Sequence, residues 1–173
     1  IIGQAPSQSG IKNQKPWFDK SGEKMINSWF FVSQDIFYNQ DLFYLTALGL
    51  YFPGKNKKGG DAKPSLVWAE TWLRREVKYL KPEIFLVVGA MAANFFFPKK
   101  EFKSLVFSDQ TLNHKPAFVL PHPSPLNIKW FKDNPDFQNR IVYIRNKIHQ
   151  ALNENYVSSK TNPNSKMFGY DKE

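Results

Sequence analysis

The chain of 173 residues contains no cysteine. It also has no apolar run near the ~18–20 residues that a membrane-spanning helix needs. The first absence excludes disulfides, cysteine-bound zinc and iron–sulfur clusters. The second excludes a membrane-spanning helix. No targeting signature, internal repeat or domain linker is visible, so we expect one cytoplasmic domain at 1–157 and a polar tail at 158–173.

The composition is that of a folded, basic protein. Hydrophobic residues make up 42% of the chain and aromatic residues 16%, which excludes a disordered chain because such a chain buries too little apolar surface. Lys and Arg number 24 against 15 Asp and Glu, a formal net charge of +9. This excess is typical of proteins with a polyanionic partner. It is equally found in proteins that gain only solubility from charge.

Apolar runs alternate with helical stripes along the chain. The expected strands are 1–2, 42–51, 84–88 and 117–120, with 42–51 in the centre of the sheet. The expected helices are 25–30 with Ser21 as N-cap, a short turn from Ser33, 65–80 capped by Ser65, one after Gly89, 128–132 and 135–152. This order predicts an α/β fold, a three-layer α/β/α sandwich around a short, mostly parallel four-stranded sheet. Because Ile1 already lies in a strand pattern, we expect residues to precede it.

The segment 122–127 follows an expected strand at the edge where such sheets bind ligands. Two prolines stiffen the backbone around His122, so the imidazole is held rigidly, as a donor to developing charge must be. Ser124, Asn127 and nearby amides can hold a phosphate oxygen. The alternative is a proline-rich turn with a histidine facing solvent.

The segment 3–7 follows the first expected strand at the same edge. Gly3 permits a close approach of the backbone to a ligand, and the amides of Gln4 and Ala5 can converge on an anionic oxygen. Ser7 adds a hydroxyl for phosphate. Taken alone, this segment is equally an ordinary turn.

Together these segments resemble the uracil-DNA glycosylase superfamily, and shorter motifs between them extend the likeness. The matching motifs are Gly3-Gln4-Ala5-Pro6, Pro16-Trp17-Phe18-Asp19-Lys20-Ser21-Gly22, Leu45-Thr46-Ala47, Phe52-Pro53-Gly54, Gly59-Gly60-Asp61 with Pro64, Ala69-Glu70-Thr71-Trp72, Val87-Val88-Gly89, His122-Pro123-Ser124-Pro125 and Asn134-Pro135. The likeness covers about residues 1–150 and is greatest to a bacterial branch without an iron–sulfur cluster. It implies a DNA partner, single- or double-stranded, and neither cofactor nor metal; we expect a monomer.

The resemblance implies a monofunctional DNA glycosylase of base excision repair, which hydrolyses the N-glycosidic bond of uracil or another deaminated base flipped from DNA. Phe18 then stacks on the base, with Trp17 as the alternative, although Trp17 can equally be a core aromatic. His122 acts as a neutral donor to O2 of the departing base, with the amides of Gln4 and Ala5 assisting.

Several positions depart from the family pattern. Members that carry an acid in the first loop have it where this chain has Gln4 or Ala5, and neither residue accepts a proton. Asp19 is the nearest candidate to orient the attacking water, but it can equally cap the helix that follows it; Asp61 is a weaker candidate. Many members have an asparagine that reads uracil at the position of Ala47, so selectivity for the base is expected to weaken.

Two other functions stay open. A nucleic-acid-binding member of the same fold with weak or no activity is favoured by Gln4, Ala5 and Ala47. A hydrolase of a free nucleoside or small ester is the third hypothesis, and the basic excess argues against it. Activity on oligonucleotides distinguishes the three.

Overall fold

The computed structural model describes residues 1–57 and 59–161. Within them five strands form one sheet, in the order β2-β1-β3-β5-β4. The strands are β1 (Ile2–Gly3), β2 (Thr46–Ala47), β3 (Phe85–Val88), β4 (Gln110–Leu112) and β5 (Lys115–Leu120). Neighbouring strands run parallel, except for β4, which is antiparallel to β5. The mostly parallel sheet is confirmed, with one strand more than the expected four.

The additional strand β4 forms a hairpin with β5 at one edge of the sheet, in a segment that reads as a polar loop. The hairpin turns at Asn113 and His114, whose φ angles are +48° and +61°. Two successive residues of positive φ match the right-handed twist of paired strands, and asparagine tolerates this conformation. Asn113 also anchors the turn, because its amide donates to the carbonyl oxygen of Val77 at 3.0 Å.

The opposite edge of the sheet also differs from expectation. The segment 42–51 was expected to be a central strand, but only the two residues of β2 pair with β1, at the sheet edge. The residues before β2 bury aromatic side chains instead: the Phe43 ring lies 5.4 Å from the Phe37 ring and 6.4 Å from the Phe30 ring.

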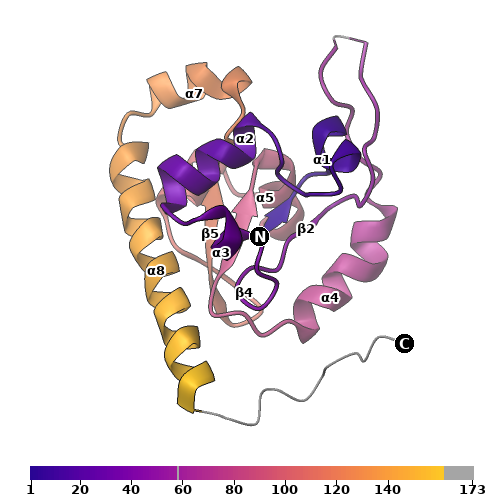
Figure 1. The fold of residues 1–173 in the computed structure, drawn as a ribbon. Helices are drawn as coiled ribbons and strands as arrows, with labels where there is room; N and C mark the ends of the chain where they lie inside the picture. Colours follow the sequence, from indigo (N-terminus) through magenta and orange to yellow (C-terminus); the bar gives the residue numbers. More distant parts are fainter. Residues whose placement is uncertain (58, 162–173) are drawn as a thin grey trace, which may run out of the picture.

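Helices cover both faces of the sheet, which gives the expected α/β/α sandwich (Figure 1). They are α1 (Gln8–Lys12), α2 (Lys20–Glu23), η1 (Lys24–Phe30), α3 (Gln34–Phe37), η2 (Ala69–Leu73), α4 (Arg74–Tyr79), α5 (Ala90–Phe96), α6 (Phe102–Phe107), η3 (Pro125–Asn127), α7 (Ile128–Asp133) and α8 (Phe137–Thr161). In the part of the chain that is described, none of them has the length and apolar character needed to cross a membrane.

The long helix α8 packs its apolar stripe into the core, where Ile141, Ile144 and Ile148 are buried. Polar contacts also join it to η1. Arg145 Nε donates a hydrogen bond to the carbonyl oxygen of Trp29 at 2.7 Å, and His149 Nε2 lies 2.7 Å from the carbonyl oxygen of Phe30. The helix continues to Thr161, so its last turn passes the expected domain end at 157; residues 162–173 of the expected tail lie outside the described residues.

Side-chain caps fix where two helical segments begin. Ser65 Oγ accepts a hydrogen bond from the Val67 amide at 3.3 Å, as expected for a cap. Ser21, however, is not the N-cap of α2. That place belongs to Asp19, whose Oδ1 accepts from the amides of Ser21 at 2.9 Å and Gly22 at 3.1 Å. A carboxylate is a strong acceptor for the free amides of a first helical turn.

Candidate active site

A hollow of about 460 Å³ lies at the carboxyl ends of β1, β2 and β5. Loops that are far apart in the sequence meet there because the parallel strands end at the same edge. The residues around it are Gly3, Ala5, Pro6, Ser7, Pro16, Trp17, Asp19, Lys20, Ser21, Leu45, Thr46, Ala47, Leu50, Asp61, His122, Ser124 and Pro125. Most of the expected site residues are therefore brought together, but Gln4, Phe18 and Asn127 do not line the hollow.

His122 is held in one orientation by its own loop. Its Nδ1 accepts a hydrogen bond from the Ser124 amide at 3.2 Å, and its carbonyl oxygen accepts one from the Asn127 side chain at 3.0 Å. The backbone enters this loop beside Gly89, whose amide donates to the carbonyl oxygen of Leu120 at 2.8 Å. An Nδ1 that accepts a bond carries no proton, so a neutral ring bears its proton on Nε2.

The charge state of His122 follows from its surroundings. Burial lowers the pKa of His122, and the nearby carboxylates of Asp19 and Asp61 oppose this shift without cancelling it. Desolvation disfavours the charged imidazolium, which the net direction reflects. His122 therefore presents a neutral ring, with an N–H donor, near neutral pH.

Trp17 is the aromatic side chain that lies against both loops. Its ring centroid is 5.7 Å from that of His122, with 35° between the planes. A Cβ added at Gly3 would approach Trp17 Cζ2 to 2.9 Å, and one added at Gly22 would overlap the Trp17 carbonyl oxygen. Both glycines are thus required by the position of Trp17, whose own φ is +59°.

Phe18, the aromatic expected to stack on the base, lies outside the hollow. Its side chain is 39% exposed, and its carbonyl oxygen accepts a hydrogen bond from Ser9 Oγ at 2.7 Å. The ammonium of Lys15 lies 5.7 Å from its ring centroid. Trp17, and not Phe18, therefore lines the hollow. We attribute this to the left-handed backbone at Trp17, because the backbone conformation sets the directions of two adjacent side chains.

Asp19 caps a helix and also lines the hollow. Its Oδ1 caps α2 through the two hydrogen bonds from backbone amides described above. Its side chain also lines the hollow, and its negative charge works to raise the pKa of His122. No hydrogen bond to its Oδ2 is found within residues 1–57 and 59–161, which leaves one carboxylate oxygen able to accept from a water molecule.

The loop 3–7 contributes backbone and small side chains to the hollow. The carbonyl oxygens of Gly3 and Gln4 continue the β1–β2 ladder by accepting from Leu48 and Gly49, each at 3.0 Å. This pairing holds the loop against the strand β2. Ser7 lines the hollow, and its Oγ also accepts from the Gly10 amide at 3.1 Å, so it caps α1 and keeps its own proton to donate.

The hydroxyl of Ser124, like that of Ser7, accepts a hydrogen bond from a backbone amide and lines the hollow. Its Oγ accepts from the Leu126 amide at 3.2 Å, which leaves the hydroxyl hydrogen to donate into the hollow. Asn127 supports the loop through its bond to His122 and does not face the hollow. Ser7 and Ser124 can therefore bind a phosphate oxygen directly, whereas Asn127 holds the loop that does so.

Several lining residues had no assigned role in the expected site, among them Leu45, Leu50 and Lys20. Leu45 and Leu50 add apolar surface beside Ala47, and Lys20 adds a cation at the rim. Leu126 does not line the hollow, but it follows Pro125, which does; it lies on η3 and is 91% exposed, the most exposed of the large hydrophobic side chains that are described. A leucine after a histidine-bearing proline loop gives no sequence signal of exposure, since leucine is most often buried.

The comparison with known families agrees with this arrangement. The family description Uracil DNA glycosylase superfamily matches residues 1–144, which is 144 of the 173 residues and includes every residue that lines the hollow. The chain belongs to the uracil DNA glycosylase superfamily.

Proposed function

We propose that the protein is a DNA glycosylase of base excision repair, which removes uracil or another deaminated base that has left the base stack. One observation carries this proposal: the imidazole of His122, the carboxylate of Asp19 and the indole of Trp17 line a single hollow. They supply a hydrogen-bond donor, a proton acceptor and a flat apolar surface, which are the parts that release of a planar base requires.

The proposed reaction breaks the bond between C1′ of the sugar and the ring nitrogen of the base, and the electron pair leaves with the base. For uracil the negative charge spreads to O2, where the Nε2–H of His122 donates a hydrogen bond. A water molecule held by Asp19 adds to the positively charged sugar at C1′ and gives its proton to the carboxylate. The products are a free base and an abasic site, and no cofactor takes part.

Trp17 is proposed to stack on the extruded base in place of Phe18. Its indole already contacts the glycine of one loop and the imidazole of the other, so a base that lies on it is within reach of both. Stacking of a base on an aromatic side chain contributes about 1–3 kcal/mol and does not depend on the identity of the base.

The DNA backbone is proposed to run along the rim of the hollow. Ser7 and Ser124 donate to phosphate oxygens there, and Lys20 neutralises a phosphate. Leu126 projects beside this rim, where an apolar side chain can fill the gap that a flipped base leaves. Such insertion compensates part of the unstacking energy, which is about a few kcal/mol per step.

A second candidate is a DNA-binding member of the family with little activity. Ala5 and Ala47, both lining the hollow, favour it, because neither side chain makes a polar contact with a base. In this case the protein binds DNA in a salt-dependent manner and releases no base.

The test measures release of uracil, hypoxanthine and xanthine from single- and double-stranded oligonucleotides by wild-type protein and by His122→Ala. We expect release by the wild type and a loss of about 10²–10³-fold in rate for the variant, since removal of one donor to a developing anion has an effect of this size. The far-ultraviolet circular dichroism of the variant checks that it is folded.

Lys81→Ala provides the matched control, because this exposed lysine lies at the amino ends of the strands, away from His122. Its rates are expected to equal those of the wild type. Folded wild-type protein that binds DNA but releases no base from any of the oligonucleotides would overturn the proposed activity and select the second candidate.

A further inference from the structure

A second carboxylate, that of Asp61, reaches the hollow from an element with no role in the proposed reaction. Residues 54–57 and 59–62 form the two arms of a hairpin, in which the amide of Asn56 donates to the carbonyl oxygen of Gly60 at 2.8 Å and that of Ala62 to the carbonyl oxygen of Gly54 at 2.9 Å. Gly54 has a φ of +86°, a conformation open to glycine. The hairpin stands above the edge of the sheet, between β2 and the helical segment that leads to α4 (Figure 1).

The side chain of Asp61 is fixed within this hairpin. Lys55 and Asp61 face each other across an antiparallel bridge, and the ammonium of Lys55 lies 2.6 Å from Asp61 Oδ1. The Asn56 side chain also donates to the carbonyl oxygen of Asp61 at 3.2 Å. Asp61 is 43% exposed at its side chain, so it is accessible to a ligand while its position is restrained. A salt bridge this exposed adds little to stability, which leaves its orienting effect as its main consequence.

Asp61 and His122 line the same hollow. The charge of Asp61 works to raise the pKa of His122, against the larger effect of burial. No hydrogen bond to Asp61 Oδ2 is found in the described parts of the chain, so one oxygen is available to a donor on a ligand. Asp19 accepts hydrogen bonds from two amides at the start of α2, whereas Asp61 comes from the segment that follows β2 and lines the same hollow as Ala47.

The chemistry of deamination gives a free carboxylate a specific use. In cytosine and adenine the ring nitrogen of the pairing edge is a hydrogen-bond acceptor; in uracil and hypoxanthine the same nitrogen carries a hydrogen. A carboxylate accepts hydrogen bonds and cannot donate them, so it binds the deaminated base and repels the lone pair of the parent base. In uracil this N3–H is the direct neighbour of C2=O2, the carbonyl assigned to His122.

We propose that Asp61, held by Lys55, is a specificity-determining residue that accepts a hydrogen bond from the ring N–H of uracil or hypoxanthine. This inference rests on the proposed function. It supplies the polar contact to the pairing edge that Ala47 lacks, and polar groups of this kind discriminate between related ligands better than apolar pockets do. Guanine already carries an N–H at this position, so Asp61 gives no discrimination between guanine and xanthine.

The experiment compares wild type, Asp61→Ala and Lys55→Met in kcat and KM on oligonucleotides that contain uracil, hypoxanthine or xanthine. We expect Asp61→Ala to raise KM for uracil and hypoxanthine about ten- to a hundredfold, the effect of losing a hydrogen bond to a charged group, with a much smaller change in kcat. Lys55→Met keeps the carboxylate but releases it, and is expected to have a smaller effect of the same kind. Asp61→Asn, whose amide can donate to a ring lone pair, is expected to lower the ratio of uracil to cytosine release.

Binding of the free bases separates this inference from the proposed function. Saturation-transfer NMR of uracil against cytosine, with wild type and Asp61→Ala, reports selectivity without any bond cleavage. Preference for uracil that disappears in Asp61→Ala supports the assignment, whether or not oligonucleotides are cleaved. An Asp61→Ala variant that releases uracil with unchanged KM and selectivity overturns it while the proposed function stands. A loss confined to kcat and equal for all bases also overturns it, because that result is typical of a residue that acts on water.

Discussion

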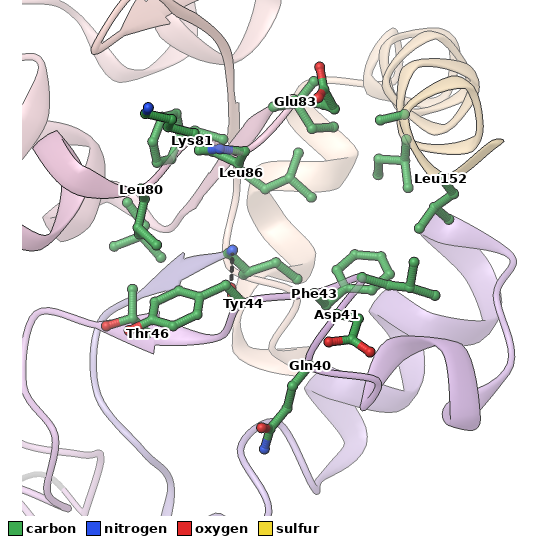
Figure 2. A pocket seen from close by; sticks show the side chains of 18 residues that line it. Gln40, Asp41, Phe43, Tyr44, Thr46, Leu80, Lys81, Glu83, Leu86 and Leu152 are labelled. Atoms are coloured by element: carbon green, nitrogen blue, oxygen red, sulfur yellow. Dashed lines mark hydrogen bonds between the residues drawn. The ribbon is translucent and has the colours of Figure 1, made fainter. Parts of the chain in front are cut away.

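The sheet carries a hollow at each end of its strands, and the two differ in chemistry more than in size. The one at the carboxyl ends measures about 460 Å³ and contains His122 and Asp19. The one at the amino ends measures about 350 Å³ and lies between the starts of β1, β2 and β3 and the helix α8. Figure 2 shows this second hollow, in which Phe43, Leu80, Leu86 and Leu152 bring apolar groups together from four segments.

Two polar side chains at the amino ends, Tyr44 and Glu83, are paired within the fold. The hydroxyl of Tyr44 donates to the carboxylate of Glu76, which raises the pKa of Tyr44 to about 12. Glu83 lies 3.8 Å from the ammonium of Lys115. At the carboxyl ends, by contrast, the hydrogen bonds of the fold engage Nδ1 of His122 and Oδ1 of Asp19, and both residues line the hollow.

The comparison shows how the carboxyl ends of a parallel sheet gather helix-capping side chains around one hollow. Chains leave the carboxyl ends through loops that begin new helices, so caps such as Ser7, Asp19 and Ser124 hold these loops and at the same time line the hollow. Chains enter the amino ends through turns that pack aromatic and aliphatic side chains. A polar group in contact with both the fold and the hollow is a better indicator of function than the volume of a cavity.

Of the substitutions that distinguish the carboxyl ends of the strands from the amino ends, one at Asp19 is expected to change the rate of base release most. Asp19→Asn keeps an N-cap, because asparagine caps helices about as well as aspartate, but it removes the proton acceptor. We expect the rate of base release to fall about 10²–10⁴-fold, the contribution typical of a general base, while the melting temperature stays close to that of the wild type. Single-turnover rates and thermal unfolding measure the two quantities.

Two further variants control this prediction. Asp19→Ala removes the cap as well, and is expected to lose about 0.5–2 kcal/mol of stability in addition to the rate. Glu83→Gln changes a carboxylate at the amino ends and is expected to leave the rate unchanged. An Asp19→Asn variant as fast as the wild type would show that this residue only caps α2.

A smaller effect is expected at Trp17, and it decides between two adjacent aromatic residues. Trp17→Ala removes the stacking surface and is expected to weaken binding of the substrate base about 5- to 150-fold, which corresponds to ~1–3 kcal/mol. Trp17→Phe restores most of the loss. Phe18→Ala, which alters a ring outside the hollow, is expected to change KM little, and an effect of Phe18→Ala larger than that of Trp17→Ala would reverse the assignment.

A matched pair of lysines tests which end faces DNA. Lys20 lines the hollow at the carboxyl ends and Lys81 the hollow at the amino ends, and both are exposed. Lys20→Ala is expected to reduce the slope of log K against log salt by ~0.9 on duplex DNA, because one phosphate contact is lost. Lys81→Ala is expected to keep the wild-type slope. Equal effects of the two substitutions would mean that DNA is not confined to the proposed end.

Strong local patterns made much of the fold predictable. The continuous apolar run at β3, the stripe of α8 and the end of β5 at Pro121 all have the structure that their patterns indicate. The prediction of a central strand at 42–51 was wrong. Residues that favour strands, such as Leu42 and Phe43, indicate a buried segment but do not show that its backbone pairs with another strand. The hairpin of β4 was missed although Asn113 gave a signal, since asparagine favours the positive φ of its turn.

The site was predictable to the level of loops and less so to the level of side chains. From the order of the motifs it could be predicted that the loops of His122, Asp19 and Gly3 meet at one hollow. The positive φ of Trp17 could not, because it depends on the tertiary structure around Gly22. For Asp19 the sequence favours capping and catalysis equally, because a single sequence does not reveal that both cap bonds go to one carboxylate oxygen. The pairing of Lys55 with Asp61 depends on the hairpin register, which composition alone does not give.

The smallest effect expected is a dependence of stability on pH that arises at the carboxyl ends. Burial lowers the pKa of His122, so the unfolded chain binds a proton at a higher pH than the folded protein does. The stability from the neutral imidazole is therefore complete above the unfolded pKa and is lost as pH falls through the folded pKa, where protonation of Nδ1 breaks the bond from the Ser124 amide. Urea unfolding between about pH 7.5 and about pH 5 measures this loss. His122→Gln is expected to show a shallower decrease than the wild type, and a variant with the same decrease would place the pH-sensitive group elsewhere.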